Sequence, residues 1–360
     1  MLLNKFSDFY KRFEKWISPV GLVYGFIFTS LTLTRVDMWL ENFWIVLHLL
    51  IAGFGIIALT YFENKAEKSE NISFHFYLTL IIQFAFGGLF STFFVFYMRS
   101  ASLGESWLFL LILLILLIGN ELWKKHYSRL VFQISILFIS LYLFLVFLLP
   151  VIWHRLGADL FIYAGILSLF ITFLFTLLLR RYSQEKFNNN HNLIKISVIS
   201  IFVLMNVLYF TDIIPPIPLS LKTAGVYHGI IKDTAGNYLA QAEPSVWQDY
   251  FTRYPVFQAV KGEKVYAFSA VFSPGKFVTE IVHQWQYYDE VKKEWVNYNK
   301  IALPVTGGRE EGFRTYSLSN SLKDGLWRVR VMIPSGQTLG NIKFEIKNSS
   351  TTPKTTTKVL

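Results

Sequence analysis

Long apolar runs alternate with short polar loops over the first 211 residues. A helix needs about 20 mostly apolar residues to cross the hydrocarbon core of a bilayer. Seven runs reach or approach that length, so the pattern predicts a transmembrane α-helical bundle of about seven helices over residues 17–211. The predicted spans are 17–34, 43–62, 74–98, 107–122, 130–150, 160–179 and 193–211.

Residues 1–16 carry aromatic side chains at helical spacing, with basic residues between them. Such a pattern indicates an amphipathic helix that lies at the membrane interface and leads into the first span. An ordinary helical extension of that span explains the pattern equally well. No small-residue cleavage site follows the apolar run, so we do not expect a cleavable signal peptide.

After residue 211 the pattern changes. Three prolines within residues 215–218 cannot continue a helix, and they predict an extended, semi-rigid spacer over residues 212–222. Short segments with alternating apolar and polar residues then predict an all-β sandwich domain over residues 223–347. Its expected strands are 225–231, 264–272, 279–288, 295–304, 313–318, 326–333 and 342–347. The Ser-, Thr- and Lys-rich residues 348–360 are predicted to be disordered.

Basic residues are distributed unevenly between alternate loops of the predicted bundle. Twelve Lys and Arg residues lie on the side of the N-terminus and three on the other side. Because cytoplasmic loops are enriched in Lys and Arg, this bias predicts a cytoplasmic N-terminus. An odd number of spans then places the β-domain outside the cytoplasm. The sequence therefore predicts a multi-pass protein of the cytoplasmic membrane with an extracytoplasmic C-terminal domain.

The composition agrees with a membrane protein. Hydrophobic residues make up 53% of the chain and charged residues only 16%, against about 25% charged in soluble domains. The net charge of +10 is spread over span-flanking loops and a mixed-charge domain, so we expect the lipid bilayer, and not nucleic acid, as a partner. The absence of cysteine excludes disulfides, thiolate catalysis and cysteine metal sites.

Polar residues inside the predicted spans are candidates for function because they cost free energy in hydrocarbon. The main intramembrane candidates are His48, Gln83 and Asn206. Such side chains either join helices by hydrogen bonds or line a path for an ion or substrate. No relay of ionisable residues connects them in the sequence, which favours the structural interpretation.

Several motifs of the predicted β-domain carry a family resemblance. They are His283-Gln284-Trp285, Gly312-Phe313-Arg314-Thr315-Tyr316-Ser317, Gly325-Leu326-Trp327-Arg328-Val329 and Gly340-Asn341-Ile342-Lys343-Phe344. With this spacing, residues 256–347 resemble the bacterial domain-of-unknown-function family 2914, in a member with an N-terminal multi-span region. The resemblance implies a bacterial membrane or envelope protein. It implies no activity, because none is assigned to the family.

The candidate ligand-binding residues of the β-domain are aromatic and basic. Trp285, Trp295 and Trp327 either fill the sandwich core or form a platform that stacks on sugar rings. Arg314 and Arg328 suit carboxylate or phosphate partners, or else form cross-strand ion pairs. Arg309 lies on a Gly-rich loop, where a charged side chain is either simply solvated or part of a binding site.

The sequence contains no recognisable catalytic, metal-binding or cofactor-binding motif, so it does not favour an enzyme. Two functional hypotheses follow. In the first, the bundle anchors a β-sandwich that binds or scaffolds a cell-envelope component, namely a glycan, a lipid headgroup or a protein. In the second, the bundle is a transporter or an intramembrane enzyme, and the sandwich is an accessory domain.

Overall fold

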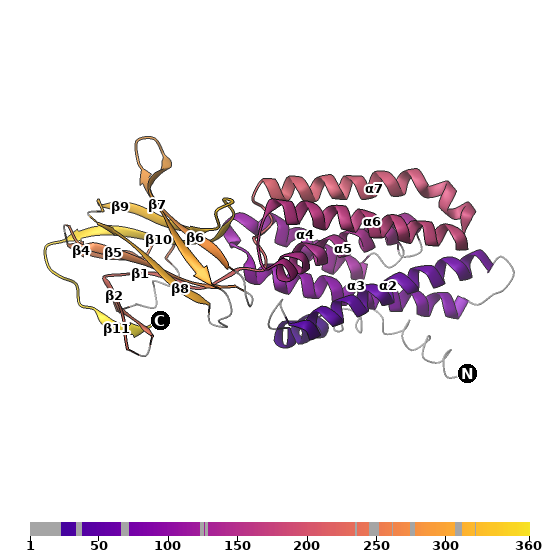
Figure 1. Ribbon diagram of the computed structural model, residues 1–360, viewed down its shortest axis with the longest axis horizontal. Coiled ribbons are helices and arrows are strands. Elements are labelled where there is room, and N and C mark those ends of the chain that lie inside the picture. Colours follow the sequence, from indigo (N-terminus) through magenta and orange to yellow (C-terminus); the bar gives the residue numbers. More distant parts are fainter. Residues whose placement is uncertain are drawn as a thin grey trace. The chain divides into compact units, whose positions relative to one another are not determined.

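The computed structural model describes residues 23–33, 38–65, 72–122, 126, 129–234, 236–244, 252–260, 262–273, 278–306, 312–320 and 322–360. These residues form two compact units, a helical unit that contains most of the chain up to Ile214 and a β-rich unit of Pro215–Leu360, to which Ser100–Glu105 and His154–Leu156 also belong (Figure 1). The predicted interfacial segment 1–16 and the candidate Arg309 lie outside the described residues.

The helical unit follows the predicted apolar runs. Its helices are α2 (Trp39–Lys65), α3 (Ile72–Ser100), α4 (Leu103–Leu122), α5 (Leu130–Trp153), α6 (Ala158–Tyr182) and α7 (Gln184–Phe210), after a shorter apolar helix at Val23–Thr32. In the described part of the chain, five helices are long and apolar enough to cross a membrane, namely α2, α3, α5, α6 and α7. A bundle of apolar helices is therefore confirmed, whereas the count of seven crossings stays a prediction.

Helix α5 is the most deeply buried of the long helices. Of the residues in its most apolar stretch, 78% are buried, and it packs against α2, α6 and α7. Its sequence explains this position, because apolar side chains surround the helix on all sides and leave no polar face for solvent. In the most apolar stretches of α6 and α7, only 33% and 22% of the residues are buried.

The β-unit contains three sheets. The three-stranded sheet has the order β1 (Ser220–Tyr227), β5 (Lys264–Phe272), β8 (Phe313–Asn320). The five-stranded sheet has the order β4 (Val256–Val260), β10 (Thr338–Ser349), β9 (Gly325–Met332), β6 (Val278–Asp289), β7 (Glu294–Thr306). The small sheet joins β11 (Thr356–Val359), β3 (Tyr238–Ala242) and β2 (Gly229–Lys232).

One hydrophobic core lies between the three-stranded and five-stranded sheets. Val265 and Val271 of β5 contribute from one side, and Trp285 of β6 with Val329 of β9 from the other. The alternation predicted from the sequence positions these residues, because successive side chains of a strand point to opposite faces. Two sheets that share one core in this way form a sandwich, which agrees with the predicted β-domain.

The predicted strands are present with shifted ends, and β3, β4 and β11 are additional. The predicted strand at 225–231 is two strands, since the chain leaves the three-stranded sheet at His228. There the His228 backbone N–H donates to the Gln241 carbonyl of β3 over 3.0 Å. Sequence alternation continues through this point, so it could not reveal that the chain changes sheets.

The proline-rich segment is folded into turns instead of extended. The Ile217 N–H donates to the Pro215 carbonyl over 2.9 Å, and the Leu219 N–H donates to the Pro216 carbonyl over 3.1 Å. In the turn from Pro216 to Leu219, Pro218 occupies the second central position after a cis Ile217–Pro218 bond, an arrangement that is typical of type VI turns. Strand β1 begins at Ser220, inside the predicted spacer 212–222. The expectation of an extended spacer is therefore wrong.

The predicted disordered tail 348–360 is largely ordered. Strand β10 continues to Ser349, and Thr356–Val359 forms β11, which pairs antiparallel with Leu239–Ala242 of β3. Threonine and valine are β-branched and favour strands, whereas the prediction of disorder rested only on the polar composition of the tail.

Candidate functional site

Two of the three tryptophans considered for a sugar-stacking platform lie inside the core. Trp285 is 0% exposed and Trp327 is 1% exposed. The Trp285 Nε1 donates to Ser317 Oγ over 3.0 Å, and the Trp327 Nε1 donates to the Lys323 carbonyl over 2.8 Å. Buried indoles with satisfied N–H groups cannot stack on a ligand, so the core interpretation of these two residues holds, whereas Trp295 is only half-buried.

A buried polar network joins the two sheets beside Trp285. His283 Nε2 lies 2.8 Å from Ser269 Oγ of β5, and His283 Nδ1 lies 2.8 Å from Ser317 Oγ of β8. Ser269 Oγ continues to Thr315 Oγ1 at 3.2 Å. Burial lowers the pKa of His283 to about 4, so the imidazole is neutral at pH 7. The adjacent Ser and His side chains are fully enclosed, and we assign them a structural role.

This network explains two of the motifs that carry the family resemblance. His283 and Trp285 belong to the first motif, and Thr315 and Ser317 belong to the second. The motifs lie on different sheets, yet their side chains meet in one hydrogen-bonded chain through the core. The spacing within each motif keeps both residues on the inward face of the strand.

The outward face of the five-stranded sheet brings together an arginine, an indole and two amides. The Arg328 guanidinium carbon lies 4.4 Å from the centre of the Trp295 ring, which is a cation–π contact. Arg328 Nε donates to Gln286 Oε1 over 2.6 Å, and Gln286 Nε2 donates in turn to Asn297 Oδ1. We call the set Arg328, Trp295, Gln286 and Asn297 the Arg328 cluster.

Further aromatic rings extend the Arg328 cluster. The Trp295 ring lies 5.4 Å from that of Tyr288 and 6.4 Å from that of Tyr254. All three rings are half-buried and so remain partly accessible. An aromatic surface next to a guanidinium offers both a stacking face and a positive charge.

Unused hydrogen-bonding capacity lies beside the Arg328 cluster. Strand register places Arg330 of β9 between Gln284 of β6 and Asn341 of β10. Gln284 Oε1 and Asn341 Oδ1 are buried oxygens without a hydrogen-bond partner in the described part of the chain. Most buried polar atoms in proteins have a partner, so two unpaired acceptors on one sheet face are unusual.

The structure separates the predicted arginines. Arg328 lies on β9 of the five-stranded sheet, whereas Arg314 lies on β8 of the three-stranded sheet, opposite Ala270. Arg314 is therefore not part of the Arg328 cluster. Trp295 was expected, together with Trp285 and Trp327, either to fill the core or to form a sugar-stacking platform, whereas Gln286 and Asn297 were not among the candidates predicted from the sequence. Their outward position on the same face as Arg328 was the only available signal.

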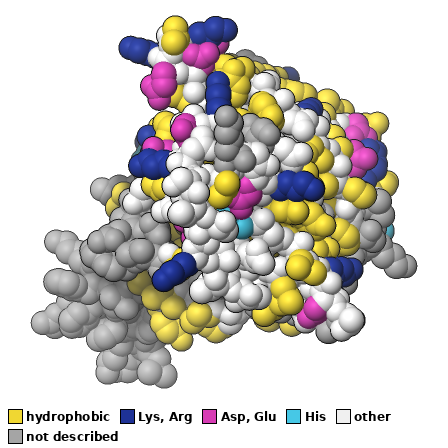
Figure 2. All heavy atoms as spheres, turned by 90° about the vertical axis from the view of Figure 1, so that its left-hand side faces the viewer, with side chains coloured by type: hydrophobic (Ala, Val, Ile, Leu, Met, Phe, Trp, Pro, Cys, Tyr) yellow, Lys and Arg dark blue, Asp and Glu magenta, His cyan; other side chains and the backbone are white. Residues whose placement is uncertain are grey.

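Charge alone does not mark a site on this domain. Figure 2 views the β-domain from its free end and shows basic and acidic side chains intermingled there. A group of mixed sign stands at the top, where Figure 1 places the turn between β6 and β7. The Arg328 cluster is distinguished by its combination of side chains, not by net charge.

A second polar cluster lies around His228, between β1 and β2. His228 Nδ1 lies 2.7 Å from Glu263 Oε1, and His228 Nε2 lies 3.1 Å from Glu243 Oε1. The ring stacks on Phe257 at 4.2 Å. Burial lowers the pKa of His228, but hydrogen bonds and charge from Glu243 and Glu263 outweigh this, so the pKa is raised above 6.5.

The His228 cluster is a structural clamp. Glu243 Oε1 also accepts the backbone N–H of Gln258, and Glu263 Oε2 accepts that of Val260. The cluster therefore ties β4 to segments on both sides of it. Sequence reasoning missed the cluster because His228 is separated from the two glutamates by 15 and 35 residues. Among the described residues, no three His, Cys, Asp or Glu side chains form a metal site.

The intramembrane candidates do not come together. His48 Nδ1 bonds the Trp44 carbonyl at 2.7 Å within its own helix. Gln83 Nε2 donates to the Asn120 carbonyl, and Asn120 Nδ2 donates to the Gln83 carbonyl, which joins α3 to α4. Asn206 Nδ2 donates to Tyr142 Oη over 3.2 Å and so joins α7 to α5.

Comparison with solved structures gives weak similarities. An immunoglobulin-like protein from Pseudomonas aeruginosa shares 9% identity over 36% of this chain and 96% of its own, with a TM-score of 0.20. A β-glucosidase from Listeria innocua shares 11% identity over 31% of this chain and 16% of its own, with a TM-score of 0.19. An alkylpurine DNA glycosylase from Pseudomonas fluorescens shares 10% identity over 86% of this chain and 99% of its own, with a TM-score of 0.23. Scores this low establish neither a shared fold nor a shared activity.

No curated protein matches the chain. A family model does match, over residues 278–346, and its description is "Protein of unknown function (DUF2914)". The matched stretch runs from the first residue of β6 into β10 and contains His283, Trp285, Ser317 and Arg328. The resemblance expected from the motifs is therefore confirmed, and the C-terminal β-domain of this membrane protein carries a DUF2914 region.

Proposed function

We propose that the helical bundle anchors the protein in the cytoplasmic membrane and that the β-domain binds an acidic glycan of the cell envelope through the Arg328 cluster. One observation carries the proposal, namely the Arg328 guanidinium held between the partly accessible Trp295 ring and the Gln286 amide. The cation–π contact and the hydrogen bond fix the guanidinium in place before any ligand binds, which lowers the entropic cost of binding.

The side chains of the Arg328 cluster suit a charged sugar. Aromatic faces stack on the apolar faces of sugar rings, and amides hydrogen bond to hydroxyl groups. A guanidinium forms paired hydrogen bonds with carboxylate or phosphate. A protein partner needs a larger apolar patch than the three half-buried rings of Trp295, Tyr288 and Tyr254.

The orientation of the bundle supports a ligand outside the cytoplasm. The bias of twelve basic residues to three between alternate loops favours a cytoplasmic N-terminus. Seven crossings then give the β-domain an extracytoplasmic location, where envelope glycans are found. The alternative of a transporter or intramembrane enzyme receives less support, because His48, Gln83 and Asn206 each bond to other groups of the protein and do not converge.

A binding measurement with the full-length protein in detergent tests the proposal. The probe is a set of soluble peptidoglycan fragments with free carboxylates, compared with the same fragments after amidation of the carboxylates. We expect Arg328→Gln and Trp295→Ala to weaken binding more than about tenfold, as central interface residues commonly do. Arg314→Gln, on the other sheet, is the matched control and should bind normally. Equal binding by all variants, or equal binding of both fragment sets, would overturn the proposal.

A further inference from the structure

A groove lies between α6 and α7 on the least covered side of the helical unit. Its volume is about 580 Å³, within the range of about 300–1,000 Å³ that is usual for small-ligand pockets. The two helices run side by side and are separated only by Ser183 (Figure 1). Both walls of the groove therefore come from one helical hairpin.

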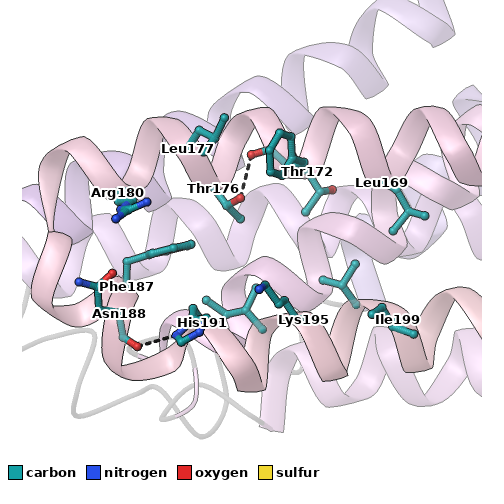
Figure 3. A pocket seen from close by; sticks show the side chains of 13 residues that line it. Leu169, Thr172, Thr176, Leu177, Arg180, Phe187, Asn188, His191, Lys195 and Ile199 are labelled. Carbon is teal, nitrogen blue, oxygen red and sulfur yellow. Dashed lines mark hydrogen bonds between the residues drawn. The ribbon is translucent and has the colours of Figure 1, made fainter.

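The two ends of the groove differ in chemistry. Apolar side chains line most of its length, among them Leu169, Phe173, Leu177, Val198 and Ile199. The end nearer Ser183 is lined by Arg180, Asn188 and His191, and Lys195 lies farther along α7, between His191 and Ile199 (Figure 3). A groove with a long apolar part and a cationic end matches an amphiphile with an anionic head.

The sequence of α7 explains how this arrangement arises. The first nine residues of the helix are mostly polar, and a predominantly apolar stretch begins only at Leu193. The facing part of α6 remains apolar almost to Arg180. An apolar wall of α6 thus faces a polar wall of α7 over the first turns of α7. Side chains that suit the polar head of an amphiphile therefore lie beside side chains that suit its apolar tail.

Lys195 lies within the apolar run of α7. Its neighbour Ile194 is buried and Lys195 itself is exposed. A charged side chain at this depth is unfavourable in hydrocarbon unless it reaches the interface or finds a partner. Lys195 was not among the intramembrane residues singled out from the sequence, although a lysine two residues after the start of a predicted span is a clear signal.

The cationic end of the groove is not neutralised by acidic lining residues. No Asp or Glu is among the residues that line the groove in the described part of the chain. The nearby Glu63 of α2 is already paired with Lys186 of α7 and with His75 of α3, the latter at 2.6 Å. Arg180 and Lys195 therefore remain as positive charges for an external anion.

We propose that this groove binds one anionic phospholipid. The phosphate-containing head contacts Arg180 and Lys195, with Asn188 and His191 as further hydrogen-bonding groups. An acyl chain follows Phe173, Leu177 and Ile199 along the hairpin. By the basic-residue bias this end of α6 and α7 is cytoplasmic, the leaflet in which basic pockets between helices commonly select anionic lipids. The proposal does not depend on the Arg328 cluster or on a glycan ligand.

Native mass spectrometry of the full-length protein, with defined lipids added in detergent, tests the proposal. We expect retention of phosphatidylglycerol in preference to phosphatidylcholine of the same acyl length. The variant Arg180→Gln/Lys195→Gln should weaken phosphatidylglycerol binding roughly 30-fold, since two basic contacts are removed. Arg181→Gln is the matched control, because Arg181 is exposed at the same helix end but does not line the groove.

A second variant tests the apolar part of the groove. Leu177→Trp places a larger side chain in the groove at an exposed position of α6, where the fold should tolerate it. It should also reduce phosphatidylglycerol binding while leaving the melting temperature of the lipid-free protein unchanged. Equal binding of the two lipids, equal loss in Arg181→Gln, or normal binding by the charge variant would each overturn the proposal.

Discussion

His283 of β6 and Ser317 of β8 are joined across the two sheets by a hydrogen bond of 2.8 Å between Nδ1 and Oγ. The same hydroxyl accepts the indole N–H of Trp285 at 3.0 Å. Ser317→Ala would leave His283 Nδ1 and Trp285 Nε1 without this hydrogen-bond partner in the core. An unsatisfied buried group costs about 1–3 kcal/mol, so we expect the β-domain of the purified protein to melt roughly 3–10 °C lower.

Ser319→Ala is the control for this effect. Ser319 is the next inward residue of β8 and is also buried, but in the described part of the chain it is not a partner of His283 or Trp285. Its melting temperature should stay close to that of the wild type. A similar loss in both variants would show that burial of a serine hydroxyl, and not the network, determines stability here.

The His228 cluster should make the β-domain more stable at mildly acidic pH. The pKa of His228 is raised above 6.5 because Glu243 and Glu263 stabilise its charged form more than burial opposes it. A raised pKa gives stability that is fully present below the unfolded value and is lost as the pH rises through the folded value. We therefore expect the melting temperature to fall between about pH 6 and pH 8.

The variant His228→Gln identifies the source of this pH dependence. Glutamine keeps one donor for a carboxylate but has no charge to lose, so its melting temperature should change less over the same pH interval. His283 is neutral throughout this interval because burial lowers its pKa to about 4, so it cannot contribute. Parallel pH curves for the wild type and His228→Gln would contradict the assignment.

Helices α2 and α3 approach closely where Gly88 faces His48. A Cβ atom on Gly88 would lie 2.7 Å from Cδ2 and Nε2 of the His48 ring. Gly88→Ala should therefore destabilise the bundle by about 1–3 kcal/mol, as overpacking commonly does. His48→Ala removes the obstructing ring, so the double variant should recover part of the loss. Thermal melting of the four proteins in detergent measures the coupling free energy between positions 48 and 88. Strictly additive losses of stability would show that the two residues do not share this contact.

The sequence predicts the parts of this fold that depend on local periodicity. The alternation of Trp327, Val329 and Val331 with Arg328 and Arg330 correctly separates the inward from the outward face of β9. Apolar runs likewise locate helices α2 to α7, because length and hydrophobicity are properties of one segment. The burial of Trp285 was left open, since an indole suits either a core or a ligand platform.

Features that depend on strand pairing were not predictable in this way. Trp295 meets Arg328 because β6 lies between β7 and β9, with Trp295 opposite Tyr288 and Arg328 opposite Gln286. A bulge after Trp285 further shifts the register between β6 and β7. Nothing local to any one strand specifies this order, and the same limitation concealed the contacts of His228 with Glu243 and Glu263.

The orientation of the protein can be tested by introducing single cysteines, because the chain contains no native cysteine that would have to be removed first. Val291 lies in the turn between β6 and β7 and is 92% exposed, and Asn189 is exposed in the first turns of α7. If the β-domain is extracytoplasmic, a membrane-impermeant maleimide should label Val291→Cys in intact spheroplasts. It should label Asn189→Cys only after the membrane is permeabilised. The opposite pattern would reverse the orientation, and labelling of both sites in intact spheroplasts would show that α7 does not separate them across the bilayer.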